Sequence, residues 1–120
     1  MRYKLLGKSG LRVSELCLGT MTFGEDWGWG ASEEVSRQIL DAFAQAGGNF
    51  VDTAVNYTNG SAERILGECL KSDRDHFVVA TKYTLTSEDQ TDPNRGGNHR
   101  KNMMRSVETS LRRLHPPVRR

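Results

Sequence analysis

The chain has 120 residues, and its 17 basic and 15 acidic side chains leave a formal net charge of +2. This near balance does not favour nucleic acid or an anionic membrane as a partner. The sequence has no stretch near the roughly 20 apolar residues that a membrane-spanning helix needs, and no apolar run suited to a secretory signal. We therefore expect a cytoplasmic protein whose two cysteines, Cys17 and Cys69, are reduced.

The first segment predicts a β-hairpin. Residues 3–6 and 11–14 are short, partly alternating segments on either side of Gly7-Lys8-Ser9-Gly10, which has the composition of a four-residue turn. Leu16-Cys17-Leu18-Gly19 follows as a short apolar strand. Residues 20–30 are rich in glycine and aromatic side chains and match neither the helical nor the strand period, so we expect a loop there.

A first helix is predicted after Ser32, whose side chain can cap it. Gly47-Gly48 would end this helix, since glycine tolerates the left-handed backbone found at many helix ends. Its apolar residues recur at helical spacing and give one apolar face: Val35, Ile39, Leu40, Phe43 and Ala46.

A second strand is predicted at residues 49–52, followed by a helix capped by Ser61. The apolar positions of this helix are Ile65, Leu66, Cys69 and Leu70. Residues 76–81 form the clearest strand, a continuous apolar run of the kind that is buried in parallel sheets.

Residues 84–98 are polar and contain Pro93 and Gly96-Gly97, so a long loop is expected. We predict that Asn98 caps a third helix and that Pro116-Pro117 ends it. One face of this helix would carry Met103, Met104, Val107, Leu111 and Leu114. Strands that alternate with helices in this way predict an α/β fold with a parallel sheet and right-handed crossovers.

Three polar residues lie at the carboxyl ends of the predicted parallel strands. Asp52 closes the second strand, Tyr57 lies in the loop that follows, and Lys82 closes the third strand. Ligands of parallel α/β folds gather at this edge. An ammonium group beside Tyr57 would favour its phenolate form, and a carboxylate would hold the ammonium in place. Together they form a proton donor suited to the alkoxide that develops during carbonyl reduction.

Each of these residues also has a simpler interpretation. Asp52 could be a turn or helix cap, Tyr57 a packing residue with a wet hydroxyl, and Lys82 a solvent-facing side chain. Trp27 and Trp29 either line an apolar substrate pocket or pack within their loop. The histidines His76 and His99 are far from each other and from the cysteines, so no metal site is predicted.

Several motifs in the correct order resemble the aldo-keto reductase family. Asp52-Thr53-Ala54-Val55-Asn56-Tyr57 is similar to the family signature Asp-Thr-Ala-x-x-Tyr, and Asn59-Gly60-Ser61-Ala62-Glu63 to the segment that follows it. Ala80-Thr81-Lys82 resembles the strand that carries the catalytic lysine of the family. The similarity runs from about Tyr3 to Leu114 and also includes residues 10–14, 18–24 and 106–114.

The resemblance implies an NADP(H)-dependent oxidoreductase that reduces aldehydes or ketones to alcohols. In it Tyr57 would be the general acid, Lys82 the cation that eases loss of its proton, and Asp52 the carboxylate that orients Lys82. Asp52 would also contact the nicotinamide ribose. Gly19, Thr20 and Met21 would lie near the nicotinamide, and NADPH would supply the hydride.

A closed barrel of eight strand–helix units needs about 250 residues. The resemblance therefore implies a partial (β/α)8 barrel: the hairpin and about three strand–helix units, with residues 1–120 forming the N-terminal part of a reductase domain that departs from the family after residue 114. His115 lies beside two prolines, so no catalytic role is assigned to it. The alternative function is an inactive truncated or frameshifted reductase. An open sheet edge would in either case favour self-association.

Overall fold

The computed structural model describes residues 1–86 and 91–115 of the chain. The hairpin consists of β1 (Tyr3–Leu5) and β2 (Arg12–Ser14), which pair antiparallel with Tyr3 opposite Ser14. The next strands, β3 (Leu18–Gly19), β4 (Phe50–Asp52) and β5 (Val78–Ala80), form a separate parallel sheet in the order β3-β4-β5. The hairpin and the parallel sheet both confirm the sequence-based prediction.

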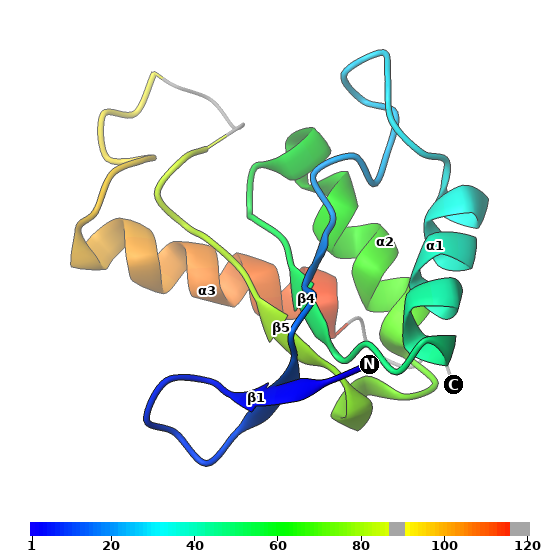
Figure 1. Ribbon diagram of the computed structural model, residues 1–120. Coiled ribbons are helices and arrows are strands. Elements are labelled where there is room, and N and C mark those ends of the chain that lie inside the picture. Colours follow the sequence, from blue (N-terminus) through cyan, green and yellow to red (C-terminus); the bar gives the residue numbers. More distant parts are fainter. Residues whose placement is uncertain (87–90, 116–120) are drawn as a thin grey trace.

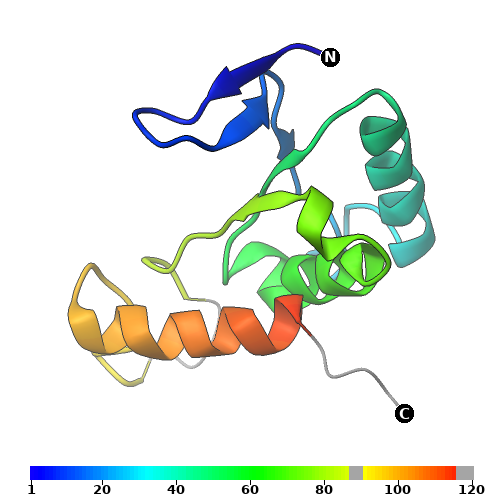
Figure 2. The ribbon, with the colours of Figure 1, turned by 90° about the horizontal axis from the view of Figure 1, so that it is seen from below.

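Three α-helices connect or follow these strands: α1 (Glu33–Gln45), α2 (Ser61–Leu70) and α3 (Arg100–Leu114). Two short 3-10 turns, η1 (Tyr57–Gly60) and η2 (Arg74–His76), precede α2 and β5. Figures 1 and 2 show that all three helices lie on one side of the parallel strands. α2 lies between α1 and α3 and contacts both. This layering is the one expected of part of a (β/α)8 barrel.

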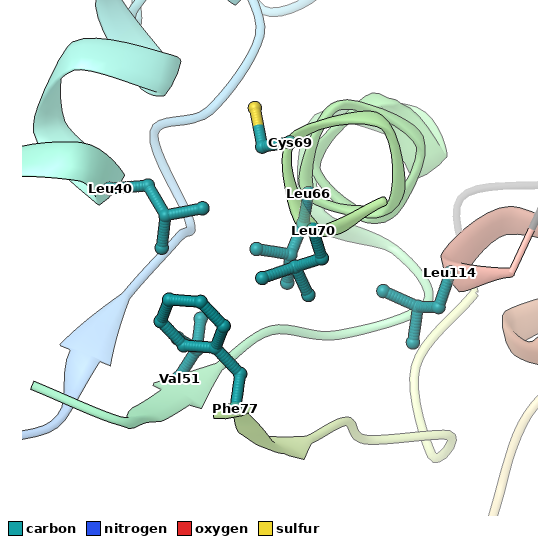
Figure 3. Close-up of a cluster of buried hydrophobic side chains, with 7 residues drawn as sticks. All are labelled: Leu40, Val51, Leu66, Cys69, Leu70, Phe77 and Leu114. Atoms are coloured by element: carbon teal, nitrogen blue, oxygen red, sulfur yellow. The ribbon is translucent and has the colours of Figure 1, made fainter. Parts of the chain in front are cut away.

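The hydrophobic core fills the space between the sheet and these helices (Figure 3). Val51 of β4 and Leu66 of α2 are fully buried at its centre, and Leu114 closes the side next to α3. The buried members of the cluster are Leu40, Val51, Leu66, Cys69, Leu70, Phe77 and Leu114. Leu18 and Val79 pack against the cluster from the neighbouring strands.

Side chains alternate between the two faces of a strand, so the neighbours of Val51 and Val79 face away from the core. These neighbours are Phe50 and Asp52 on β4 and Val78 and Ala80 on β5, and all four are only half-buried. All three residues of β5, Val79 included, are half-buried, so its continuous apolar run is not buried on both faces. In a closed barrel the opposite face would point toward the barrel interior.

The polar side chain of Asn49 fixes the position of the hairpin relative to the sheet. Its Oδ1 accepts a hydrogen bond from Ser14 N at 2.8 Å, and its Nδ2 donates to Arg12 O at 3.1 Å. Asn49 N also donates to Ser14 Oγ at 3.2 Å. The residue that precedes β4 thus holds the end of β2 through three hydrogen bonds.

Of the three predicted helix caps, one is confirmed and two are wrong. Ser32 Oγ accepts from Val35 N at 3.3 Å, as predicted for α1. Ser61 is instead the first residue of α2, and its hydroxyl donates to Asp26. Asn98 pairs with Thr84, while the ring of His99 accepts the hydrogen bond from Asn102 N that caps α3. Both errors are shifts of one residue, which sequence patterns resolve poorly.

The apolar side predicted for α3 coincides only in part with its buried side. Asn102, Ser106, Ser110 and Leu114 are the residues buried there, at a spacing of four. Met104, Val107 and Leu111 remain 45–54% exposed. The apolar side is rotated from the buried side by about one residue, and Leu114 belongs to both. On α1, similarly, Leu40 is buried and Val35 and Ile39 are exposed. The predicted stop at Pro116-Pro117 lies outside the described residues.

Candidate active site

The structure brings Asp52, Tyr57 and Lys82 into direct contact. The ammonium of Lys82 donates to Asp52 Oδ2 at 2.6 Å, to Tyr57 OH at 3.1 Å and to Thr53 O at 2.9 Å. Its Nζ also lies 4.8 Å from the centre of the Tyr57 ring. Lys82, at the end of β5, therefore links the carboxylate and the phenol, which both lie on the segment that includes β4 and the loop after it.

The register of the parallel strands explains this convergence. Asp52 lies opposite Ala80 in the pairing of β4 with β5, so Lys82 follows two residues beyond the same level of the sheet. Two main-chain hydrogen bonds continue the ladder past the strand ends, from Thr53 N to Ala80 O at 2.9 Å and from Val55 N to Lys82 O at 3.0 Å. The side chains of Asp52 and Lys82 consequently leave the sheet side by side.

The electrostatics of the site favour a charged lysine. Burial alone would lower the pKa of Lys82, but hydrogen bonds to Asp52 and Tyr57 and the charge of Asp52 outweigh it, so the pKa lies above its ordinary value. The side chains of Lys82 and Asp52 are 50% and 34% exposed. The ion pair is therefore partly screened by water, and its value lies in the placement of the ammonium rather than in stability.

The backbone after Tyr57 adopts an unusual conformation. Thr58 and Asn59 have positive φ angles of 44° and 56°, and a β-branched residue such as threonine rarely adopts this region. Thr58 is fully buried. Its hydroxyl donates to Phe23 O at 2.6 Å and accepts from Ala62 N, in the first turn of α2, at 2.9 Å. These bonds hold the turn that directs Tyr57 toward Lys82.

A hollow of about 330 Å³ opens beside Tyr57 and Lys82. Ala54, Asn56, Thr84 and Leu85 complete its wall. Trp27 and Trp29 are not part of this wall: their rings pack at 5.7 Å from each other, and the Trp27 indole donates to Asn59 Oδ1 at 3.4 Å. The packing interpretation of the two tryptophans is thus the one that matches their contacts.

The residues predicted to meet a nicotinamide lie at the same sheet edge. Gly19 is paired with Asp52, is exposed, and has no neighbouring atom where a Cβ would lie. Met21 is 46% exposed, whereas Thr20 is fully buried and its hydroxyl donates to Asp52 O at 3.1 Å. A flat ring with polar edges fits against the bare backbone at Gly19, the apolar Met21 and the accessible carboxylate of Asp52. Thr20 supports Asp52 from within the fold.

Sequence reasoning missed a buried ion pair behind the site. Glu63 of α2 is fully buried, and its Oε2 lies 3.0 Å from Nη1 of Arg113, whose side chain is 10% exposed. The available signal was helical spacing, because Glu63 shares the face of Leu66 and Leu70 that packs against the sheet. A carboxylate on such a face needs a cationic partner.

The described residues contain neither a metal-binding cluster nor a helix suited to span a membrane. No group of three or more His, Cys, Asp or Glu side chains in residues 1–86 and 91–115 is placed to hold a metal ion. None of the helices in the same ranges is both long and apolar enough to cross a membrane.

The model of the family described as "Aldo/keto reductase family" matches residues 15–116 of the chain. Norsolorinic acid reductase stcV of Emericella nidulans is 44% identical over 88% of the chain. Aryl-alcohol dehydrogenase [NADP(+)] of Phanerodontia chrysosporium is 42% identical over 88% of the chain. The chain spans 30% and 31% of the lengths of these two relatives.

The chain is also similar to a solved aldo-keto reductase structure. The holo form of aldo-keto reductase AKR11C1 from Bacillus halodurans superposes with a TM-score of 0.80 at 33% sequence identity. The superposition covers 95% of this chain and 36% of that protein.

Proposed function

The chain belongs to the aldo/keto reductase family, and on that premise we propose that its site reduces aldehydes or ketones to alcohols with NADPH as the hydride donor. The observation that carries the proposal is the contact of Lys82 Nζ with both Tyr57 OH and Asp52 Oδ2. The family is one of oxidoreductases, and one relative is named for NADP(+).

Tyr57 is the proton donor in this proposal. Tyr57 lines the hollow together with Ala54, Asn56 and Leu85, and a carbonyl compound bound there would accept a hydrogen bond from its hydroxyl. As hydride reaches the carbonyl carbon, the oxygen gains negative charge and takes the phenolic proton. The ammonium of Lys82 stabilises the phenolate left on Tyr57, and Asp52 keeps that ammonium aimed at the phenol.

NADPH, when bound, supplies the hydride. Gly19 and Met21 would lie against the nicotinamide, and Asp52 would meet the ribose, while Thr20 fixes the main chain of Asp52. The half-exposed face of β3 and β4 offers room for this arrangement. The remaining contacts of a dinucleotide would have to come from elsewhere.

We propose an aromatic carbonyl compound as the substrate class. Two relatives are named for norsolorinic acid and for aryl alcohols, and the hollow of about 330 Å³ is large enough for one substituted ring. Leu85 and Ala54 would contact the ring, and Asn56 offers an amide to a polar substituent.

The second candidate is an inactive reductase, which keeps the site residues but does not turn over a substrate. Its support is the exposure of the site, since the side chains of Lys82 and Asp52 are open to water. Water at the site weakens electrostatic stabilisation of developing charge. In the described part of the chain, β3 and β5 are the outer strands of the parallel sheet. Exposed strand edges of this kind would favour self-association.

The test is a fluorescence titration of the purified chain with NADPH, followed by an aromatic aldehyde in the same cuvette. The reductase proposal expects saturable binding and NADPH consumption, with consumption lost and binding kept in Tyr57→Phe. Tyr3→Phe, far away in the hairpin, is the matched control and should behave as the unmodified chain. Absence of binding at millimolar NADPH would reject the reductase proposal for this chain and support the second candidate.

A further inference from the structure

The buried pair Glu63–Arg113 touches both loops that carry the site residues. Arg113 Nη1 donates to Val55 O at 2.8 Å, two residues before Tyr57. Glu63 Oε1 accepts from Thr81 Oγ1 at 2.8 Å, one residue before Lys82. The third contact is the ion pair itself, with Glu63 Oε2 3.0 Å from Arg113 Nη1. A single network therefore runs from the Tyr57 loop through the two helices to the Lys82 strand.

This network lies behind the main-chain bond that already joins the two loops. Val55 N donates to Lys82 O at 3.0 Å, while Val55 O receives Arg113 from the helix side. The main-chain N–H and C=O of Val55 are thus both hydrogen-bonded, the first to Lys82 and the second to Arg113. These contacts join the two loops to each other and to the Glu63–Arg113 pair.

Two glycines provide the space that the arginine occupies. A Cβ at Gly60 would lie 2.6 Å from Cζ of the Arg113 guanidinium, and one at Gly67 would collide with the main-chain carbonyl of Arg113. α2 and α3 lie side by side in both views of the fold (Figures 1 and 2). The absence of side chains at Gly60 and Gly67 therefore leaves room for Arg113 beside η1 and α2.

We propose that Glu63 and Arg113 are positioning residues, which hold the Tyr57 loop and the Lys82 strand at the separation that lets Lys82 contact Tyr57. The inference rests on the proposed reductase function for its kinetic consequence, although the geometric consequence stands without it. Neither residue faces the hollow beside Tyr57. Their effect reaches the reacting atoms through Val55 and Thr81.

If Glu63 and Arg113 only stabilised the helix packing, replacing both would have a different effect on the site. Replacing both members of a buried ion pair with apolar residues of similar size is often neutral or stabilising, because it removes two desolvated charges. In Glu63→Met/Arg113→Met the helices should still pack, but Val55 O and Thr81 Oγ1 lose their partners. The double variant thus separates helix packing from loop positioning.

The gentlest variant acts at Thr81. Thr81→Val removes the hydroxyl at nearly constant shape and leaves the Glu63–Arg113 pair intact, whereas Thr81→Ser keeps the hydroxyl. Arg112→Met is the matched control for the arginine, since Arg112 is exposed and bonds to Thr109 on its own helix. All variants are first compared by circular dichroism and urea denaturation.

The activity-independent readout is the titration of Lys82, followed by NMR through its 13Cε signal and assigned with Lys82→Arg. In the unmodified chain the pKa of Lys82 should lie above its ordinary value because of its bonds to Asp52 and Tyr57. It should fall toward the ordinary value in Thr81→Val and in the double variant, and stay raised in Thr81→Ser and Arg112→Met. An unchanged titration in both Thr81→Val and the folded double variant would overturn the proposal.

The kinetic readout is NADPH-dependent reduction of an aromatic aldehyde. Misplacement of a proton donor by about 1 Å lowers kcat on the order of 100-fold, so Thr81→Val should lower kcat by about 10-fold or more with KM little changed. Equal kcat in Thr81→Val and Thr81→Ser would count against the proposal. If the unmodified chain shows no turnover, the reductase function fails, and the NMR titration alone decides the positioning role.

Discussion

The ammonium of Lys82 and the carboxylate of Asp52 join the ends of two neighbouring parallel strands, with Nζ 2.6 Å from Oδ2. The register of β4 and β5 produces this pairing, because Asp52 lies opposite Ala80 and Lys82 follows two residues later. The same ammonium reaches Tyr57 OH at 3.1 Å. Lys82 therefore bonds to both other site residues, and the titration of its ammonium group can report on the geometry of the site.

Lys82→Met should change how stability depends on alkaline pH. The folded pKa of Lys82 is raised, so its contribution to stability is fully present below the ordinary lysine value of about 10.4 and is lost as pH rises through the folded value. In urea denaturation above about pH 10, the unmodified chain should lose more stability than Lys82→Met. Parallel pH profiles of the two proteins would contradict the raised pKa.

Leu66→Ala should lower the free energy of unfolding by about 2–5 kcal/mol, because Leu66 is fully buried at the centre of the core and a cavity would remain. The control is Leu111→Ala on α3, where the leucine is 54% exposed and the expected change is within about 0.5 kcal/mol. Urea denaturation measures both. Similar losses in the two variants would show that the apolar side of α3 is covered in solution.

Thr58→Ala should destabilise the turn after Tyr57. The change removes the Thr58 hydroxyl that bonds to Phe23 O and Ala62 N, both in buried residues, and a buried polar group that loses its partner costs about 1–3 kcal/mol. Thr58→Ser keeps the hydroxyl and should retain most of the stability. The comparison is by thermal and urea unfolding, and equal stabilities of the two variants would show that the hydroxyl bonds do not stabilise the turn.

Gly67→Ala should destabilise the chain although alanine is about 1 kcal/mol better than glycine in a helix interior. The reason is the close approach of α3, since an added Cβ would collide with the main-chain carbonyl of Arg113. Gly10→Ala in the hairpin has no atom within 4 Å of the added Cβ and serves as the control. A stabilised Gly67→Ala would mean that α2 and α3 are not in contact in solution.

Much of the fold could be predicted because its signals are local. Strand–helix alternation, the hairpin turn at Gly7–Gly10 and the Ser32 cap depend on residues close together in sequence, and each matches the structure. The convergence of Asp52, Tyr57 and Lys82 was also predictable. The carboxyl ends of parallel strands must meet at one edge, so three polar residues placed there are brought together by topology.

Other features depend on packing between distant segments. The sequence alone determined the order of the elements, the family and the residues at the sheet edge. The tertiary structure decided that α3 buries Ser106 and Ser110 rather than Val107 and Leu111, and that Glu63 meets Arg113 across 50 residues. Periodicity reports that a helix has an apolar side but not which side its neighbours approach. That choice depends on shape, on the space left by Gly60 and Gly67, and on the pairing of buried charges.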